Sequence, residues 1–180
     1  MLCALISLIR CALGESKTMA NKGQMTGMLG VYLVAAELSR RGFIVSPTSR
    51  SAAGADLLVT DQACRKAWSV QVKTNSGRPN FWLVGAHAQQ IKSDSHMYVF
   101  VNNARGDKPE FIVAPSEHVA AKVYYSVASK GSEWYTFSTA DRPTEGEGWE
   151  QFGNPNPDPN VAAALQAETQ ADVSPDSSIG

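Results

Sequence analysis

Residues 54–74 read GADLLVTDQACRKAWSVQVKT. Two runs within this stretch, 55–60 and 67–74, are rich in β-branched and aliphatic side chains, and a polar segment separates them. Short apolar runs on either side of a polar turn are typical of two paired strands. The stretch therefore predicts a β-hairpin, and the rest of the chain is interpreted around it.

The hairpin carries three polar side chains whose positions are linked by its geometry. A turn centred near Cys64 sets Asp56 on the first strand almost opposite Val72 on the second. Side chains alternate along a strand, so Gln71 and Lys73 share one face while Val72 points to the core. Asp56 then lies within cross-strand reach of an amide and an ammonium group. A solvated strand face shows the same alternation, and it remains the alternative interpretation.

Length and composition predict one domain followed by a tail. The chain has 180 residues, of which 43% are hydrophobic, enough for one sizeable core. Residues 153–180 hold four acids and no Lys or Arg, and they are rich in Pro, Ala and Ser, which predicts a disordered acidic tail. Of the 17 acids and 16 bases in the chain, the first 152 residues keep 13 and 16, a net charge of +3. That charge permits a phosphate-bearing partner.

The N-terminal residues and the cysteines bear on location. Residues 1–18 open with an apolar run that is too short to span a bilayer, and Arg10 follows this run instead of preceding it. We interpret them as an extension outside the core domain, which then covers 19–152. The three cysteines form no metal-binding spacing, and their odd number argues against a disulfide framework. A reducing, cytoplasmic location is the expectation.

The periodicity of the other segments predicts a mixed α/β fold. Apolar residues recur at helical spacing in 24–41, before a glycine that favours a helix end. In chain order we expect a helix at 24–41, a short strand at 43–45, the hairpin, an apolar run at 81–84, strands at 97–102 and 110–113, a second helix at 117–129, and a strand or loop at 134–137. This order predicts a mixed central sheet flanked by helices.

The element order and the polar residues together resemble the PD-(D/E)XK, or restriction-endonuclease-like, nuclease superfamily. The resemblance covers roughly residues 24–115, and it is carried by Asp56, Gln71 and Lys73. Gln71 stands where most members have an acid, as in the QxK variant. The Holliday-junction-resolvase-like and Mrr-like branches are the most similar. The resemblance implies a restriction-endonuclease-like αβββαβ core.

It also implies an activity, which is metal-dependent hydrolysis of DNA by an endonuclease. Asp56, the side-chain oxygen of Gln71 and the backbone carbonyl of Val72 would bind Mg²⁺ or Mn²⁺. Lys73 would orient or deprotonate the attacking water, or stabilise the developing charge. DNA is the expected partner, a homodimer is an open option, and no membrane association is expected.

One position departs from the family pattern. These branches commonly place a Glu after a glycine on the first helix, and here Val31 follows Gly30. Glu37 is a further candidate ligand, but six residues place it about 240° around the helix from Val31, and pairing with an arginine is its alternative role. The alternative function is therefore a degenerate nuclease-fold protein that binds nucleic acid or a protein partner without cleavage.

Two loop arginines and one aromatic residue complete the candidates. Arg50 and Arg78 flank the hairpin, where they would contact phosphates. Trp82 lies in the apolar run 81–84, so it either stacks on a base or, as is more usual for such a residue, belongs to the core.

Overall fold

The computed structural model of the chain describes residues 21–49, 54–103, 108–129, 131–156 and 160. The predicted N-terminal extension lies outside these residues, as do Arg50 and most of the predicted acidic tail. None of the described helices is long and apolar enough to cross a bilayer.

The first described element is the helix α2, Lys22–Arg40. It begins with a capping box, in which the Asn21 side chain accepts a hydrogen bond from the Gln24 backbone N–H at 2.8 Å and the Gln24 side chain accepts one from the Asn21 N–H at 3.3 Å. It ends before Gly42, whose φ of 94° is a conformation that glycine adopts without strain. The predicted helix is present and starts two residues earlier than expected.

The main sheet has five strands in the order β1-β2-β3-β5-β6. β3 and β5 are parallel, and the other neighbours are antiparallel. The bounds are Ile44–Pro47 for β1, Leu57–Thr60 for β2, Ala67–Asn75 for β3, His96–Asn102 for β5 and Glu110–Pro115 for β6. The predicted α/β class, a mixed sheet flanked by helices, is confirmed.

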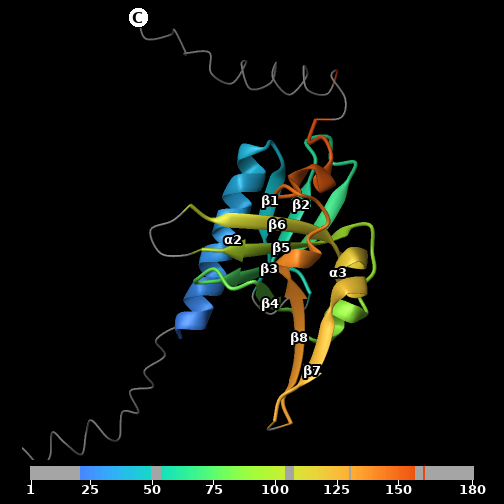
Figure 1. The fold of residues 1–180 in the computed structure, drawn as a ribbon. Coiled ribbons are helices and arrows are strands. Elements are labelled where there is room, and N and C mark those ends of the chain that lie inside the picture. The colour runs from blue at the N-terminus through green and yellow to red at the C-terminus, as the bar shows by residue number, and fades with distance from the viewer. Residues whose placement is uncertain (1–20, 50–53, 104–107, 130, 157–159, 161–180) are drawn as a thin grey trace, which may run out of the picture.

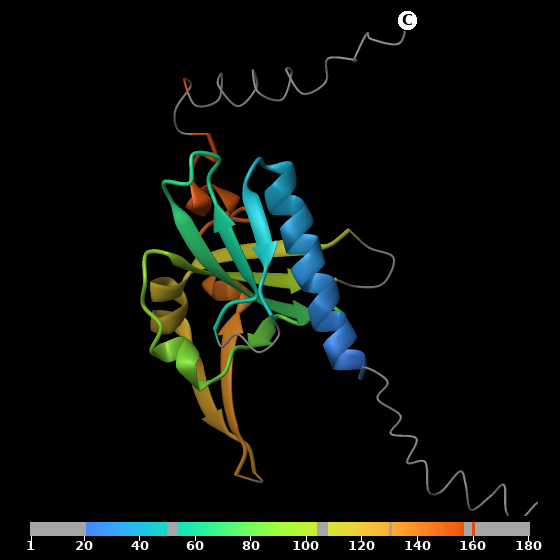
Figure 2. The ribbon, with the colours of Figure 1, turned by 180° about the vertical axis from the view of Figure 1, so that it is seen from behind.

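The two faces of this sheet are covered by different layers (Figures 1 and 2). On one face α2 buries Val34 and Leu38 against Val70 and Val99. On the other face lies a second core, which includes Phe100. Because both faces of β5 are covered, all seven of its residues are buried, which explains its continuous apolar sequence.

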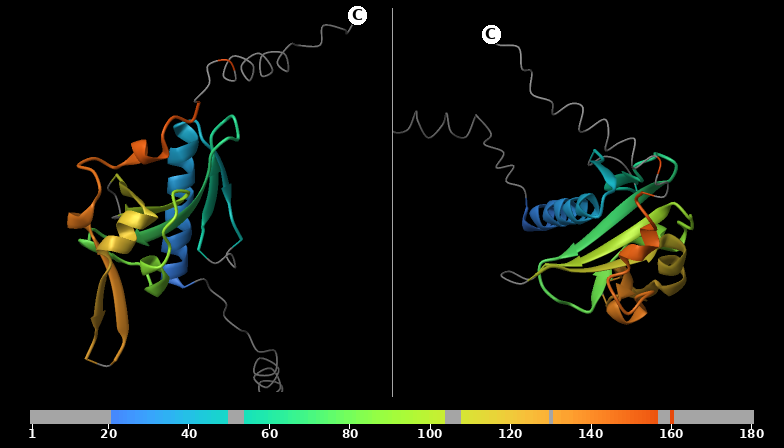
Figure 3. Two further views of the ribbon diagram at one scale, coloured as in Figure 1. Left: turned by 90° about the vertical axis from the view of Figure 1, so that its right-hand side faces the viewer. Right: turned by 90° about the horizontal axis from the view of Figure 1, so that it is seen from above.

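The second layer contains a smaller sheet in the order β4-β8-β7. Its strands are β4 at Phe81–Leu83, β7 at Tyr124–Val127 and β8 at Glu133–Ser138. The β7–β8 hairpin extends beyond the main sheet (Figure 3). Two short helices, η1 at Ala86–Gln89 and α3 at Ser116–Lys122, contact each other in the same layer.

Two connections differ from the expected pattern. The predicted helix at 117–129 ends at Lys122, because the following Val-Tyr-Tyr-Ser-Val favours a strand and pairs with β8. The crossover between the parallel strands β3 and β5 contains β4 and the 3₁₀ helix η1, so its only described helical segment is short. A last 3₁₀ helix, η3 at Trp149–Phe152, buries both of its aromatic end residues in the α2-side core.

A close approach fixes the position of α2 on the sheet. Gly30 lies so near Thr74 on β3 that a Cβ built on the glycine would be 1.7 Å from the Thr74 Oγ1. Only a residue without a side chain fits this crossing. The contact sets the height of the next residue, Val31, over the sheet.

Candidate metal-binding site

The hairpin register is one residue away from the predicted one. Leu57 pairs with Val70, and the Asp56 N–H donates to the Val70 carbonyl at 2.8 Å, so Asp56 is level with Gln71 and not with Val72. The turn explains the register, because the buried Asp61 carboxylate accepts from the Arg65 N–H at 2.9 Å and from the following N–H at 3.2 Å.

The structure brings Asp56 and the polar residues of β3 together as the sequence predicts. The Asp56 Oδ2 accepts from the Gln71 Nε2 at 2.8 Å and from the Val72 N–H at 2.7 Å. A flip of the Gln71 amide would exchange this donor for Oε1, which could then share a cation with the carboxylate. The second carboxylate oxygen, Oδ1, accepts no hydrogen bond from the described residues.

A segment that the sequence did not single out holds the backbone of this aspartate. The Thr48 N–H donates to the Asp56 carbonyl at 3.0 Å, and the Thr48 Oγ1 donates to the Ala55 carbonyl at 2.6 Å. These bonds link the end of β1 to the start of β2. No short motif signals them, because the contact depends on the pairing of the two strands.

Lys73 lies on the same side of β3 as Gln71, facing away from α2. Burial lowers the pKa of the Lys73 ammonium, and the negative charge of Asp56 opposes that shift without reversing it. Among the described residues Lys73 makes no ion pair and no hydrogen bond. Lys73 is therefore a partly desolvated amine near a carboxylate, a combination found at many functional sites.

A hollow of about 290 Å³ opens beside Asp56, between α2 and the ends of β1 and β3. We call it the Asp56 hollow; its lining includes Gln24, Met28, Val31, Thr48, Asp56 and Val72. Asp56 is the one acidic residue among its described lining residues. Val31 lines the hollow at the helix position where the family resemblance leads us to expect a carboxylate.

The donor set around Asp56 suits a hard cation held by few protein ligands. It offers one carboxylate, one amide oxygen and backbone carbonyls, all of which are oxygen ligands preferred by Mg²⁺. No group of three or more His, Cys, Asp or Glu occurs within the described segments. The site therefore fits a Mg²⁺ ion whose coordination shell is completed by water and phosphate oxygens.

Glu37 has a different role in the structure. Its carboxylate forms a bidentate pair with Arg40, at 2.8 and 3.0 Å, and accepts from the Arg41 Nε at 2.9 Å. The Arg40 hydrogen bond is the main cause of the lowered pKa of Glu37. Glu37 does not line the Asp56 hollow. Of the two roles considered for it, pairing with arginine is the one observed.

The other two described candidates, Arg78 and Trp82, do not line the Asp56 hollow. Arg78 lies between β3 and β4 and forms an ion pair with Glu110 at 3.6 Å, with both side chains half exposed. Trp82 is buried in the second core and its Nε1 donates to the Val101 carbonyl at 3.2 Å, so it is a core residue and not a base-stacking one.

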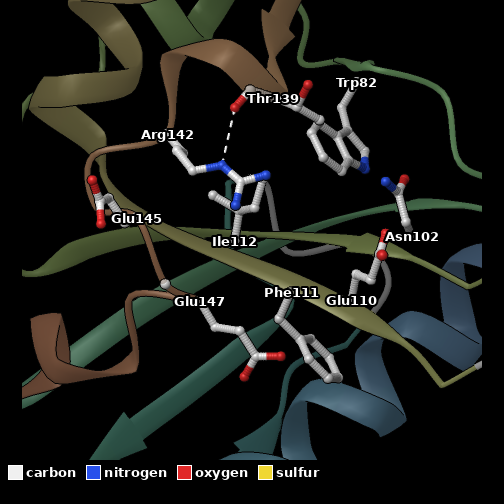
Figure 4. Close-up of a pocket in the computed structure, with 10 residues that line it drawn as sticks. Trp82, Asn102, Glu110, Phe111, Ile112, Thr139, Arg142, Glu145 and Glu147 are labelled. Atoms are coloured by element: carbon white, nitrogen blue, oxygen red, sulfur yellow. Dashed lines mark hydrogen bonds between the residues drawn. The ribbon is translucent and has the colours of Figure 1, made fainter.

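A separate cavity of about 280 Å³ lies against β6, as shown in Figure 4. The Arg142 side chain points into it and its Nε donates to the Thr139 carbonyl at 3.2 Å. Glu110, Glu145 and Glu147 also line it, but no lining residue is shared with the Asp56 hollow. It is therefore not part of the site built around Asp56.

No family model and no curated protein matches the chain. Several solved structures show a partial likeness, among them these two. One is Hjc, a Holliday junction resolvase from Archaeoglobus fulgidus, with 13% identity and a TM-score of 0.46 over 71% of this chain and 96% of the resolvase. The other is the bacterial homing endonuclease I-Ssp6803I, with 18% identity and a TM-score of 0.39 over 87% of this chain and all of the endonuclease.

Proposed function

We propose that this protein is a metal-dependent nuclease of the QxK type that hydrolyses phosphodiester bonds in DNA. The observation that carries the proposal is that Asp56 accepts hydrogen bonds from the Gln71 side chain and the Val72 N–H, beside Lys73 on β3, while Asp56 and Val72 line an open hollow. These residues supply the two requirements of such a reaction, an oxygen site for a cation and an amine for charge or proton transfer.

Asp56, the Gln71 side-chain oxygen and the Val72 carbonyl would hold Mg²⁺ or Mn²⁺ in this proposal. A bound divalent ion acidifies water and neutralises charge on a phosphate. The hydrogen bond from the Val72 N–H to the Asp56 Oδ2 orients the carboxylate of a residue that lines the hollow. The hollow is open enough to admit a phosphate group beside it.

Lys73 would act on the attacking water or on the phosphate. Because burial lowers its pKa, a larger fraction of Lys73 than of an exposed lysine is in the neutral form that can act as a base. In its charged form it would instead stabilise the negative charge that develops on the phosphate. Both roles require an amine that is not held in an ion pair, and among the described residues Lys73 forms none.

The alternative is a nuclease-fold protein that binds DNA without cutting it. Val31 favours this function, since it lines the Asp56 hollow where a second carboxylate would strengthen the metal site. A site with one carboxylate holds a divalent ion weakly. We therefore expect cleavage to require millimolar Mg²⁺ or Mn²⁺.

The test is incubation of the protein with supercoiled, linear and branched DNA in the presence of Mg²⁺ or Mn²⁺. Lys73→Ala is the inactivating variant, and Lys66→Ala, an exposed lysine in the turn of the same hairpin, is the matched control. The proposal predicts cleavage by the wild type and by Lys66→Ala only. Equal cleavage by Lys73→Ala refutes the assigned role, and retention of DNA without cleavage by any of the three supports the alternative.

The variant Val31→Glu tests the arrangement of the site separately. It adds a carboxylate to the lining of the Asp56 hollow, so Mn²⁺ affinity measured by calorimetry should rise. Leu29→Glu, which introduces the same charge at an exposed position of α2, should leave the affinity unchanged.

A further inference from the structure

The outer face of the small sheet is unusual because it is aromatic and uncharged. Side chains alternate along β4, β8 and β7, so Trp82 and Phe137 are buried while their neighbours point outward. The outward residues include Phe81, 42% exposed, Tyr124, 69% exposed, and Trp134, 41% exposed. A soluble protein rarely exposes several large aromatic side chains together unless the surface binds something.

These residues line a shallow hollow of about 350 Å³. We call it the aromatic platform; its lining residues are Asn80, Phe81, Tyr124, Ser126, Trp134, Thr136 and Ser138. Three aromatic side chains thus alternate with hydroxyl and amide groups, and no lining residue carries a charge. The buried Trp82 and Phe137 support the platform from behind.

We propose that the aromatic platform binds unpaired nucleobases of single-stranded DNA. A nucleobase is planar, uncharged and rich in hydrogen-bonding groups, which matches aromatic faces surrounded by neutral donors and acceptors. Stacking of bases on exposed aromatic side chains of a sheet is a general mode of single-strand recognition. The proposal rests on the proposed function for its choice of DNA, and it adds that the substrate has unpaired bases.

The position of charged groups agrees with this occupant. β4 and β7 both run antiparallel to β8, so both begin at the same end of the small sheet. Arg78 lies three residues before β4, and Lys122 lies two residues before β7. Both side chains are half exposed. Arg78 forms an ion pair with Glu110 at 3.6 Å, and Lys122 forms one with Asp141 at 4.0 Å. A strand whose bases stack on the platform would thus meet two cationic groups at this end, each of which also has a carboxylate partner.

The platform is also connected to the Lys73 end of β3. The Asn75 side chain, two residues beyond Lys73, donates to the Phe81 carbonyl at 3.0 Å. This bond joins the end of β3 to the first aromatic residue of the platform.

Trp134 provides a selective probe. The chain has four tryptophans, all at described positions, and the other three are buried. Titration with a single-stranded oligodeoxynucleotide in EDTA, without cleavage, should quench the fluorescence of Trp134. A duplex of the same sequence should cause little quenching and bind more weakly.

The variant Trp134→Ala should lower single-strand affinity about 5- to 100-fold, measured by fluorescence anisotropy of a labelled oligonucleotide. Tyr32→Ala removes an aromatic side chain of comparable exposure from α2 and should leave the affinity unchanged. Circular dichroism checks that both variants fold.

Three outcomes overturn the inference: equal affinity for single and double strands, equal affinity of Trp134→Ala and the wild type, or a dimer that Trp134→Ala dissociates without any effect on DNA. The third would identify the platform as an interface between copies of the chain. Loss of cleavage is a different failure, because single-strand binding that depends on Trp134 supports the platform even when no DNA is cut.

Discussion

The contact between Gly30 and Thr74 leads to a prediction with a defined sign. In Gly30→Ala the new Cβ would lie 1.7 Å from the Thr74 Oγ1 and 2.8 Å from the Thr74 Cβ. Rotation of the threonine side chain removes the first contact but not the second, because the Cβ position is fixed by the backbone. The helix must therefore move away from β3 by roughly half an ångström, which disturbs close-packed contacts.

The expected energies can be separated with a second glycine of the same helix. Overpacking of this kind costs about 1–3 kcal/mol or somewhat more, while Gly to Ala in a helix contributes about 1 kcal/mol of stability. Gly27→Ala receives only the helical contribution, because a Cβ there meets no atom within 4 Å. The helical contribution is common to both variants, so relative to Gly27→Ala, Gly30→Ala should lose about 1–3 kcal/mol of unfolding free energy.

The assay is urea denaturation followed by circular dichroism, with a thermal melt as a second measure. A loss of this size corresponds to a midpoint difference of about 2–12 °C between the two variants in a chain of this length. Thr74→Gly in the Gly30→Ala background removes the opposing Cβ and should reduce the penalty attributable to the clash. If Gly30→Ala proves as stable as Gly27→Ala, α2 does not cross β3 where the structure places it.

Three further predictions concern buried groups. Burial lowers the folded-state pKa of His96, so the unfolded chain binds the proton first as the pH falls. The unfolding free energy should therefore decrease as the pH drops below 6.5. His96→Gln should flatten that dependence, measured by urea titrations at several pH values. Asp61→Ala leaves two turn N–H groups without their acceptor and should cost about 2–3 kcal/mol in the same assay. Trp82→Ala should cost about 3–5 kcal/mol, whereas Trp82→Phe should cost less and leave DNA affinity unchanged.

The part of the fold that the sequence predicted well is the part set by local periodicity. The helix at α2, the hairpin and the strand β5 each have a pattern that a short window contains. The error at 117–129 arose where helical and strand preferences follow one another, and the pairing of β7 with β8 settled the outcome. The segment 117–129 does not contain β8, so its own sequence could not indicate this pairing.

The candidate site was predictable for a related reason. Asp56, Gln71 and Lys73 lie on one hairpin, so alternation and an approximate register were enough to bring them together. The register itself was wrong by one residue because the Asp61 side chain defines the turn. The role of Glu37 was less predictable. Whether its carboxylate faces a metal site or an arginine depends on how α2 is rotated against the sheet.

That rotation links Gly30 to the question of activity. Gly30 faces Thr74, so the residue after it is turned toward the Asp56 hollow, where Val31 is found. A carboxylate at position 31 would thus join the lining of the hollow beside Asp56, where this chain has a valine. A helix so placed supports two distinct outcomes: weak metal binding with Asp56 as the one acidic ligand of the hollow, or DNA binding alone. Val31→Glu separates them, because an added carboxylate ligand should increase cleavage only if Lys73 and the other site residues can support the reaction.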